Sequence, residues 1–311
     1  MAARAGRLDI KKPEHLAHRL DIPLPVLRTL AEEAASHSSV RELLVGKKVR
    51  PLDSADPPLK QVHDRIKTRL LDRILPTRSA HAYVKGRDSI TCAKPHVGRR
   101  CMLVVDIQDY YPSLGHRRIY RIFMDLGCSP DVARILTLLT TTRHRLPQGF
   151  KTSNALSNLF LRPIDRWLER QCDAQRLAYT RYCDNLYVSG GYHARELLPR
   201  IARNLSGLGL RPNPSKTRFM CATDQRIVCG LVVNHHLNVP DEYYRATRAQ
   251  LDRFSKTARA AYDPRTVRTT IRSLRGKISY IRRVNARRGE RLLSEFQRAC
   301  HALDGTGTTA P

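Results

Sequence analysis

Residues 179–190 read YTRYCDNLYVSG, and this stretch constrains the fold more than any other part of the chain. Apolar residues flank a short polar centre, which predicts two strands joined by a tight turn with Asp184 at its tip. A second acid, Asp106, ends the apolar run at residues 102–106. Hard divalent cations prefer oxygen ligands and bridge carboxylates to substrate phosphates. Two acids supplied by separate strands therefore indicate a two-metal site for nucleotidyl transfer.

The charge of the chain indicates the kind of partner it binds. Its 56 Lys and Arg residues outnumber its 28 Asp and Glu residues, which gives a formal net charge of +28. Such an excess attracts polyanions by long-range steering and by counterion release. We therefore expect nucleic acid as the partner. A membrane is not expected, because the sequence shows neither a long apolar run nor an amphipathic anchor.

The length and the cysteines set further limits. A chain of 311 residues can form one domain of linked subdomains or two small domains. The eight cysteines are dispersed, without a CxxC pair or a Cys/His cluster of zinc spacing, so we predict reduced and mostly buried thiols. The first residues, MAARAGRLDIKK, lack the apolar segment of a secretory signal, which predicts a cytoplasmic protein.

The residues before the first acid are predicted to be mainly helical. Apolar spacing gives two short helices within residues 13–37, broken near Pro23, and a longer helix over residues 58–75 that ends at Pro76. These helices are interpreted as scaffold. His96 follows in an irregular segment, where it is either a ligand or base or, more commonly, a histidine satisfied by local hydrogen bonds.

A basic hairpin is predicted between these helices. Residues 40–52 alternate in polarity around Gly46, as a two-stranded hairpin does. The cluster Lys47, Lys48 and Arg50 could grip a triphosphate, since arginine offers a bidentate fork to phosphate oxygens. A solvated basic turn is an equally good interpretation of these residues alone.

Helices and a glycine loop follow Asp106. A helix over residues 117–126 is predicted to end at Gly127, and Ser129 caps a further helix that runs to Leu139. Residues 146–158 form a loop that enters a helix continuing past Trp167. In that loop Gly149 would let the backbone approach a ligand closely, and Gln148 offers a donor and an acceptor.

The last third of the chain is predicted to change from mixed structure to basic helices. An amphipathic helix covers residues 192–208, and Lys216 follows a rigid turn at the start of a short strand. Residues 226–240 read as a hairpin closed at residues 234–236. Residues 241–290 carry 14 Lys and Arg against 5 acids, which suits a helical clamp on a nucleic-acid backbone.

Together these motifs resemble a reverse transcriptase of the bacterial retron type. DIQDYYPS is similar to the first catalytic motif, LPQGFKTSNALSN to the second, YCDN to the aspartate box usually written YxDD, and NPSKTRF to the lysine motif after it. RIVCGLVVN and the basic helices resemble the primer-grip and thumb regions. Five motifs in this order make the resemblance specific.

The resemblance implies an α+β fold of the right-hand polymerase type, with an antiparallel palm sheet and a helical thumb. The implied domains are N-terminal helices and fingers at 1–97, the palm with catalytic motifs and primer grip at 98–240, a basic helical thumb at 241–300, and a flexible tail at 301–311.

The resemblance also implies the site residues. The catalytic residues would be Asp106, Asp184, Asn185 and Lys216. The metal ligands would be Asp106, Ile107, Asp184 and Asn185, holding two Mg²⁺ ions, with Mn²⁺ as a substitute. The nucleotide-binding residues would be Lys48, Arg50, Asp109, Tyr110, Tyr111, Gln148 and Gly149. By the same resemblance Tyr111 would act as a steric gate against a 2′-hydroxyl, and Lys216 would protonate or neutralise the departing pyrophosphate.

The implied partners are a structured non-coding RNA that serves as template and primer, the RNA–DNA hybrid product and dNTPs. An effector protein in antiphage defence is also implied. The chain departs from the family at Asn185, where a second aspartate is usual, and at residues 92–96 and 228–230, which read CAKPH and VCG. The alternatives are a weakened or inactive polymerase-like RNA-binding protein and, more remotely, another reverse transcriptase of a defence or group II intron-like type.

Overall fold

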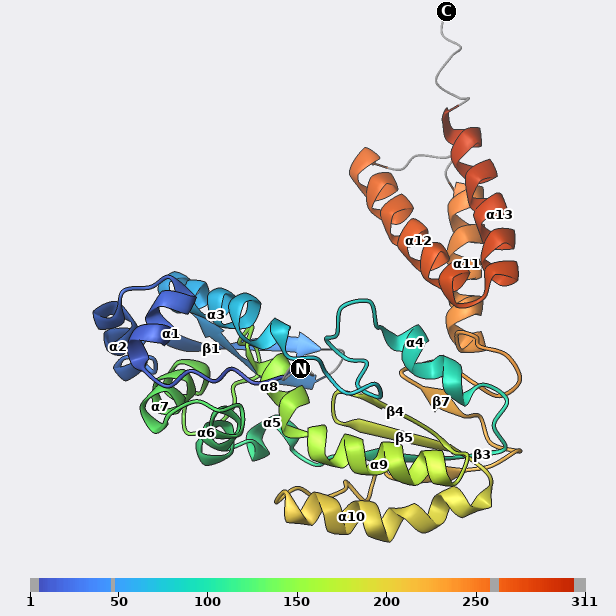
Figure 1. Ribbon diagram of the computed structural model, residues 1–311. Helices are drawn as coiled ribbons and strands as arrows, with labels where there is room; N and C mark the ends of the chain where they lie inside the picture. Colours follow the sequence, from blue (N-terminus) through green and yellow to red (C-terminus); the bar gives the residue numbers. More distant parts are fainter. Residues whose placement is uncertain (1–5, 46–47, 258–262, 305–311) are drawn as a thin grey trace, which may run out of the picture.

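A computed structural model describes residues 6–45, 48–257 and 263–304 (Figure 1). The N-terminal helices and a hairpin lie to one side of a central sheet, and three long C-terminal helices stand at the other. This arrangement of fingers, palm and thumb is a right-hand polymerase fold of mixed helix and sheet, as the sequence predicted. The exact domain boundaries stay a prediction.

The palm sheet contains residues 179–190, for which a strand-turn-strand unit was predicted. Its strand order is β4-β5-β3-β6, and all neighbours are antiparallel. The strands are β3 (Cys101–Asp106), β4 (Ala178–Tyr182), β5 (Asn185–Gly190) and β6 (Arg218–Met220). The predicted strand-turn-strand is confirmed as β4 and β5, and β3 lies beside β5, so both acids come to the same edge of the sheet.

The two faces of this sheet pack into different cores. Side chains alternate along a strand, so Leu103 and Val105 of β3 enter one hydrophobic cluster while Met102 and Val104 enter the other. The first cluster is shared with the N-terminal and palm helices, and the second with the C-terminal helices. Asp106 has the parity of Met102 and Val104, so its carboxylate emerges from the face that looks toward the thumb.

The fingers side matches the prediction closely. Its elements are α1 (Pro13–Leu20), α2 (Leu24–Glu32), β1 (Ser38–Val45), β2 (Lys48–Ala55), α3 (Pro57–Arg69) and the short 3-10 turn η1 (Leu71–Arg73). The α3 helix ends at Arg69, earlier than the predicted residue 75, and η1 leads from it toward Pro76. The hairpin pairs Val45 with Lys48, and its tip at Gly46 and Lys47 lies outside the described residues.

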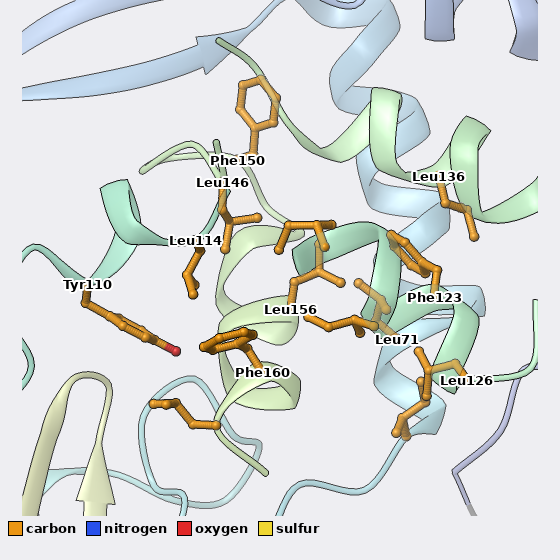
Figure 2. Packing of buried hydrophobic residues seen from close by; sticks show 14 of the residues in the cluster. Leu71, Tyr110, Leu114, Phe123, Leu126, Leu136, Leu146, Phe150, Leu156 and Phe160 are labelled. Atoms are coloured by element: carbon orange, nitrogen blue, oxygen red, sulfur yellow. The ribbon is translucent and has the colours of Figure 1, made fainter. Parts of the chain in front are cut away.

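Helices of the palm surround a dense core in which Tyr110, Phe123, Leu136, Leu156 and Phe160 meet (Figure 2). The predicted caps are present: the Ser129 hydroxyl accepts a hydrogen bond from the Val132 amide, and Gly127 has a positive φ of 87°. The elements are α4 (Ser89–Ala93), η2 (Lys94–His96), α5 (Tyr110–Ser113), α6 (His116–Asp125), α7 (Pro130–Thr140), α8 (Ser153–Phe160), α9 (Arg162–Ala174), η3 (Tyr192–Glu196) and α10 (Leu197–Gly207).

The C-terminal region contains two turns where one was predicted. The strands β7 (Ile227–Val228) and β8 (Leu231–Val232) turn at Cys229 and Gly230, both with positive φ, and the chain then turns back so that Val232 bridges Asn238. The thumb helices are α11 (Asp241–Thr257), α12 (Pro264–Val284) and α13 (Ala286–Asp304). Helix α13 therefore includes the first four residues of the predicted tail; residues 305–311 lie outside the described part.

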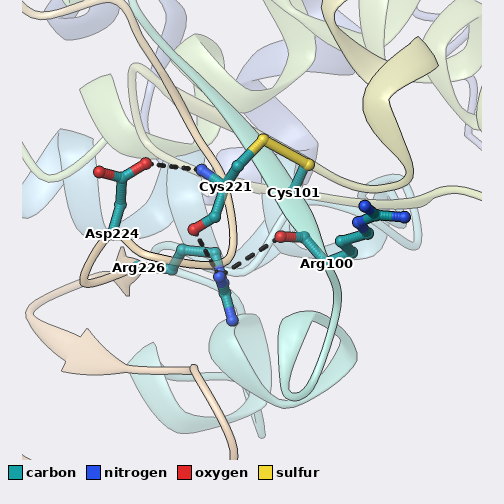
Figure 3. Close-up of a disulfide and its surroundings, with 5 residues drawn as sticks. All are labelled: Arg100, Cys101, Cys221, Asp224 and Arg226. Atoms are coloured by element: carbon teal, nitrogen blue, oxygen red, sulfur yellow. Dashed lines mark hydrogen bonds between the residues drawn. A yellow bond between two sulfur atoms is a disulfide. The ribbon is translucent and has the colours of Figure 1, made fainter.

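One prediction about the cysteines was wrong. Cys101 and Cys221 form a disulfide, with Cα atoms 4.1 Å apart, between the start of β3 and the end of β6 (Figure 3). The antiparallel register, which pairs Met102 with Met220, places these two cysteines opposite each other. Since 120 residues separate them in the chain, spacing alone could not show the pair. The six other cysteines, all within the described residues, are not part of this disulfide.

None of the helices in the described residues combines the length and the low charge that crossing a membrane requires.

Candidate active site

The two acids meet where β3 ends and the β4–β5 turn begins. Asp106 is paired in register with Asn185, the residue that follows Asp184. The Ile107 amide donates to the Asp184 carbonyl oxygen at 3.0 Å, which ties the turn to the catalytic strand. Cys183 supplies the left-handed residue of this turn, with φ of 56°. The predicted pair of carboxylates therefore comes together through backbone pairing alone.

A buried ion pair holds the β4–β5 turn in place. The Arg181 guanidinium donates to both carboxylate oxygens of Asp165, at 2.8 and 2.7 Å, and both side chains are fully buried. The same guanidinium donates to the Cys183 carbonyl oxygen at 2.9 Å. Leaving either charge buried without its partner would be strongly destabilising. Sequence reasoning missed this pair, although an arginine within an apolar strand was a visible signal.

Lys216 faces the first acid from the neighbouring segment. Its ammonium lies 3.3 Å from each carboxylate oxygen of Asp106, which is only 5% exposed. The segment is held by the Asn213 amide, which donates to the Asp106 carbonyl oxygen at 2.7 Å. The structure thus brings Lys216 to the acids, where its charge compensates that of Asp106.

The second acid experiences a different environment. Burial raises the pKa of Asp184, and the negative charge of Asp106 raises it further. The Asn185 amide nitrogen donates to a carboxylate oxygen of Asp184 at 3.0 Å, which favours the ionised form. Two carboxylates that repel each other across a sheet edge form a site whose charge a divalent cation would neutralise.

The side-chain oxygens of Asp106, Asp184 and Asn185 suit a hard divalent cation. Together they carry one negative charge less than three carboxylates would. Asp106 and Asp184 supply carboxylate oxygens, and Asn185 supplies an amide oxygen that can ligate Mg²⁺ without adding charge. Within the described part of the chain, no group of three His, Cys, Asp or Glu side chains could hold a metal ion. The Ile107 amide contacts the Asp184 carbonyl oxygen, and the ligand role of Ile107 stays a prediction.

The residues after Asp106 divide into core and site. Tyr110 is 3% exposed, and its hydroxyl donates to the Ser157 carbonyl oxygen at 2.7 Å, so its side chain belongs to the core. The Tyr111 hydroxyl donates to the Asn154 side-chain oxygen at 2.7 Å and lies 3.8 Å from the Cys183 sulfur. Asp109 is exposed in a left-handed conformation. Tyr111 therefore lies beside the acidic turn, and its role as a gate stays a prediction.

The glycine loop holds the fingers hairpin in place. The Gln148 carbonyl oxygen accepts from the Asp53 amide at 2.7 Å, and the Gln148 amide donates to the Asp53 carboxylate at 3.2 Å. Gly149 has φ of 130°, and a Cβ there would lie 2.2 Å from the Asp53 carbonyl oxygen. The close approach that this glycine allows is therefore to strand β2. Asp53, which also pairs with Arg143, was not found from the sequence.

The basic residues of the hairpin lie on β2. Lys48 begins this strand, and Arg50 is its third residue. Lys47 lies outside the described residues. The role of Lys48 and Arg50 in binding a triphosphate stays a prediction.

His96 is a structural histidine. It is 1% exposed, and its two ring nitrogens hydrogen-bond the Ser189 and Thr180 hydroxyls at 2.6 and 2.7 Å. Burial lowers its pKa to about 3, from an ordinary value near 6.5. Its hydrogen bonds attach η2 to the β4–β5 pair that carries the acidic turn, so of the two interpretations the satisfied histidine is confirmed.

This burial predicts a loss of stability in mild acid. Because the folded-state pKa of His96 lies below its unfolded value, its contribution is complete above pH 6.5 and is lost as the pH falls toward the folded value. We expect it to cost about 2 kcal/mol of unfolding free energy at pH 5 relative to pH 7.5. Urea unfolding of His96→Gln should show a correspondingly smaller pH dependence, whereas His236→Gln, at an exposed site, should behave as wild type. An unchanged slope for His96→Gln would contradict the assignment.

Fold and site together define a right-hand nucleic-acid polymerase. The chain belongs to the reverse transcriptase (RNA-dependent DNA polymerase) family, which matches residues 45–257. The predicted family is thereby confirmed.

Individual relatives point to the retron type. The chain is 30% identical to the retron Mx65 reverse transcriptase of Myxococcus xanthus over 264 residues, which cover 78% of this chain and 60% of that protein. It is 26% identical to the retron Ec86 reverse transcriptase of Escherichia coli, covering 80% and 76% of the two chains. The retron Mx162 reverse transcriptase of M. xanthus is also 26% identical, with 99% and 70% covered.

A solved structure shows the same fold at low sequence identity. Telomerase from Candida albicans, in complex with the TWJ fragment of telomeric RNA, matches with a TM-score of 0.51 and 8% identity, covering 88% of this chain and 66% of that one.

Proposed function

We propose that this chain is an RNA-directed DNA polymerase of the retron type, which extends a primer with dNTPs along an RNA template. The observation that carries the proposal is the pairing of Asp106 with Asn185, which brings Asp106 and Asp184 together at one sheet edge. Membership of the reverse transcriptase family and the retron relatives support it.

Each residue of the site would have its own role in the reaction. Two Mg²⁺ ions, or Mn²⁺ in their place, would lower the pKa of the primer hydroxyl and neutralise the triphosphate. Asp106 and Asp184 would hold both ions, with Asn185 and the Ile107 backbone as further ligands. The Asp109 and Tyr110 backbone would meet the triphosphate.

Lys216 would exchange partners during the reaction. Its ammonium contacts the Asp106 carboxylate at 3.3 Å, so a cation bound by Asp106 would displace it. A lysine released in this way would be free to neutralise or protonate the departing pyrophosphate. Gln148, Gly149, Lys48 and Arg50 would line the nucleotide from the fingers side.

The Tyr111 ring is proposed to exclude ribonucleotides. Its hydroxyl is fixed by Asn154 of α8, so the ring is a rigid wall beside the acidic turn. Replacing it by alanine should raise ribonucleotide incorporation relative to deoxynucleotide incorporation at least about 10-fold, since a steric wall worth 1.4 kcal/mol or more is removed. Single-nucleotide insertion with matched dNTP and rNTP measures the ratio. Tyr111→Phe keeps the ring and should keep the selectivity; equal selectivity in Tyr111→Ala would remove the gate role.

The proposed partners follow from the same assignment. They are a structured non-coding RNA that supplies template and primer, the RNA–DNA hybrid product, and an effector protein in antiphage defence. The cytoplasm is the proposed location. Sequencing the nucleic acid that co-purifies with the protein would identify the RNA, and recovery of only random cellular RNA would count against a dedicated template.

A second candidate function is RNA binding without catalysis. It is favoured by one observation, the amide of Asn185 in the place of a third carboxylate. Primer extension by purified protein, with its co-purified RNA and dNTPs in Mg²⁺ or Mn²⁺, decides between the two. DNA synthesis supports the polymerase, whereas no synthesis in either metal supports the binding protein.

A further inference from the structure

The outer side of the palm carries arginines that the proposed reaction does not use. Helices α9 and α10 cover the sheet face opposite to the thumb and lie at the bottom of Figure 1. Arg166 and Arg170 lie one turn apart on α9, and Arg200 and Arg203 lie about one turn apart on α10. All four side chains are exposed. We call these four arginines, with Trp167, the outer palm surface.

The acids of α9 do not neutralise these arginines. They form a separate stripe with a spacing of four residues, and each has a partner outside the outer palm surface. Asp165 binds Arg181, Glu169 accepts from Ser79, and Asp173 pairs with Arg78. Among the described residues, no side chain forms an ion pair or hydrogen bond with the guanidinium of any of the four arginines.

Neighbouring contacts show that positive charge is concentrated here. The guanidinium of Arg200 lies over the Trp167 ring, 5.5 Å from its centre, and so joins α10 to α9. Burial lowers the pKa of Arg162, and the nearby charge of Arg166 lowers it further. A cavity of about 530 Å³ lies where α9 begins and α10 ends. Arg118, Arg121 and Asp125 line it.

The chemistry of this surface selects a polyanion over a protein. Arginine forks match phosphate oxygens, and because the fork is planar, arginine loses less entropy for each hydrogen bond that it forms. A protein interface usually has an apolar centre. None of the large exposed apolar side chains among the described residues lies on α9 or α10.

We propose that the outer palm surface binds the phosphate backbone of a double-stranded RNA stem, outside the catalytic cleft. Contacts to the backbone fix position without reading sequence, and RNA stems are recognised largely by shape and backbone. This surface would therefore hold a folded stem while a different part of the RNA occupies the cleft. The inference goes beyond the proposed reaction, because it assigns a second RNA site on the opposite side of the sheet.

The chain contains its own reporter for this site. Trp167 is the only tryptophan, and its ring lies under Arg200. Titrating the full-length protein with a 20-base-pair RNA hairpin should change the Trp167 fluorescence in a saturable and salt-dependent way. Binding of a labelled hairpin by anisotropy should follow the same curve. Anisotropy that saturates while Trp167 emission stays constant would place the RNA elsewhere and overturn the proposal.

Four substitutions test the arginines directly. The variant Arg166→Gln/Arg170→Gln/Arg200→Gln/Arg203→Gln should lose the fluorescence change and bind the hairpin at least about 10-fold more weakly. The slope of log Kd against log salt should fall by about 3 to 4, because each phosphate contact contributes close to one unit. The matched control replaces the exposed residues Lys12, Arg28, Arg73 and Arg134 by glutamine, which removes the same charge. Equal losses in both variants would show only a general charge effect and would reject the site.

Two further measurements distinguish this RNA site from the polymerase site and from a site for DNA or for an acidic protein. Primer extension on a short primer–template that fills only the cleft should be unchanged in the outer palm variant, so the polymerase and the second site can fail independently. A DNA duplex of equal length and poly-glutamate of equal charge serve as competitors. Tighter binding of the DNA would reassign the surface to the product, and effective competition by poly-glutamate would reassign it to an acidic protein; either result contradicts the RNA assignment.

Discussion

Replacing Asp184 by alanine is expected to lower the rate of primer extension roughly 1,000-fold or more, because metal-assisted phosphoryl transfer depends on several kcal/mol of charge stabilisation. Asp184 stands at the tip of the β4–β5 turn, and its backbone is fixed by the Ile107 amide. Its side chain accepts a hydrogen bond from the adjacent Asn185, a contact local to the turn, so removing the side chain should leave the fold intact. Steady-state extension with dNTPs in Mg²⁺ and in Mn²⁺ measures the effect.

Two variants make this result interpretable. Asp184→Asn keeps the shape and removes the charge, so it should be nearly as inactive as Asp184→Ala if the carboxylate binds metal. Asp125→Asn removes one exposed carboxylate on α6 and should retain wild-type activity. The variant Asp184→Asn removes a negative charge near Asp106, so its thermal stability should equal that of wild type or be slightly higher. Wild-type rates in Asp184→Asn would contradict a metal-binding role.

Local patterns predicted most of the elements and the acidic pair. The polarity of residues 179–190 specifies a two-strand unit, and the cap at Ser129 specifies where α7 begins. The sequence predicted that Asp106 and Asp184 lie close together, because Asp106 ends a strand and Asp184 lies in a turn between two strands. The pairing of these strands in the sheet then fixes their register. Such features depend on neighbours within a few residues, which a sequence displays directly.

The parts that were missed depend on contacts between distant segments. Asp53 anchors the loop at Gln148 across 95 residues, and Asp165 of helix α9 neutralises Arg181 of strand β4. The Cys101–Cys221 disulfide follows from the register of β3 and β6, which no local pattern shows. The additional turn at Cys229 was missed because cysteine is an unusual residue for a left-handed conformation that favours glycine or asparagine.

The position of Asn185 decides how strongly this site can hold metal. Its side-chain amide donates to Asp184, and its backbone is paired with that of Asp106, so Asn185 lies beside both acids without adding a charge. An aspartate there would add a third negative charge within one sheet edge. Without metal, this charge would raise the pKa of Asp184 further and strain the site; with metal, it would strengthen cation binding.

Asn185→Asp is therefore expected to lower the Mg²⁺ concentration for half-maximal extension about 10-fold, equivalent to about 1.4 kcal/mol of added attraction. At limiting Mg²⁺ the rate should rise by a similar factor. The matched variant Asn185→Ala removes both the amide oxygen and the hydrogen bond to Asp184, so it should need more Mg²⁺ than wild type. If Asn185→Asp and Asn185→Ala share the Mg²⁺ dependence of wild type, residue 185 contributes no ligand, and Asp106 and Asp184 hold the ions alone. If Asn185→Asp gains DNA synthesis that wild type lacks in either metal, the protein is instead an RNA-binding relative whose single amide prevents catalysis.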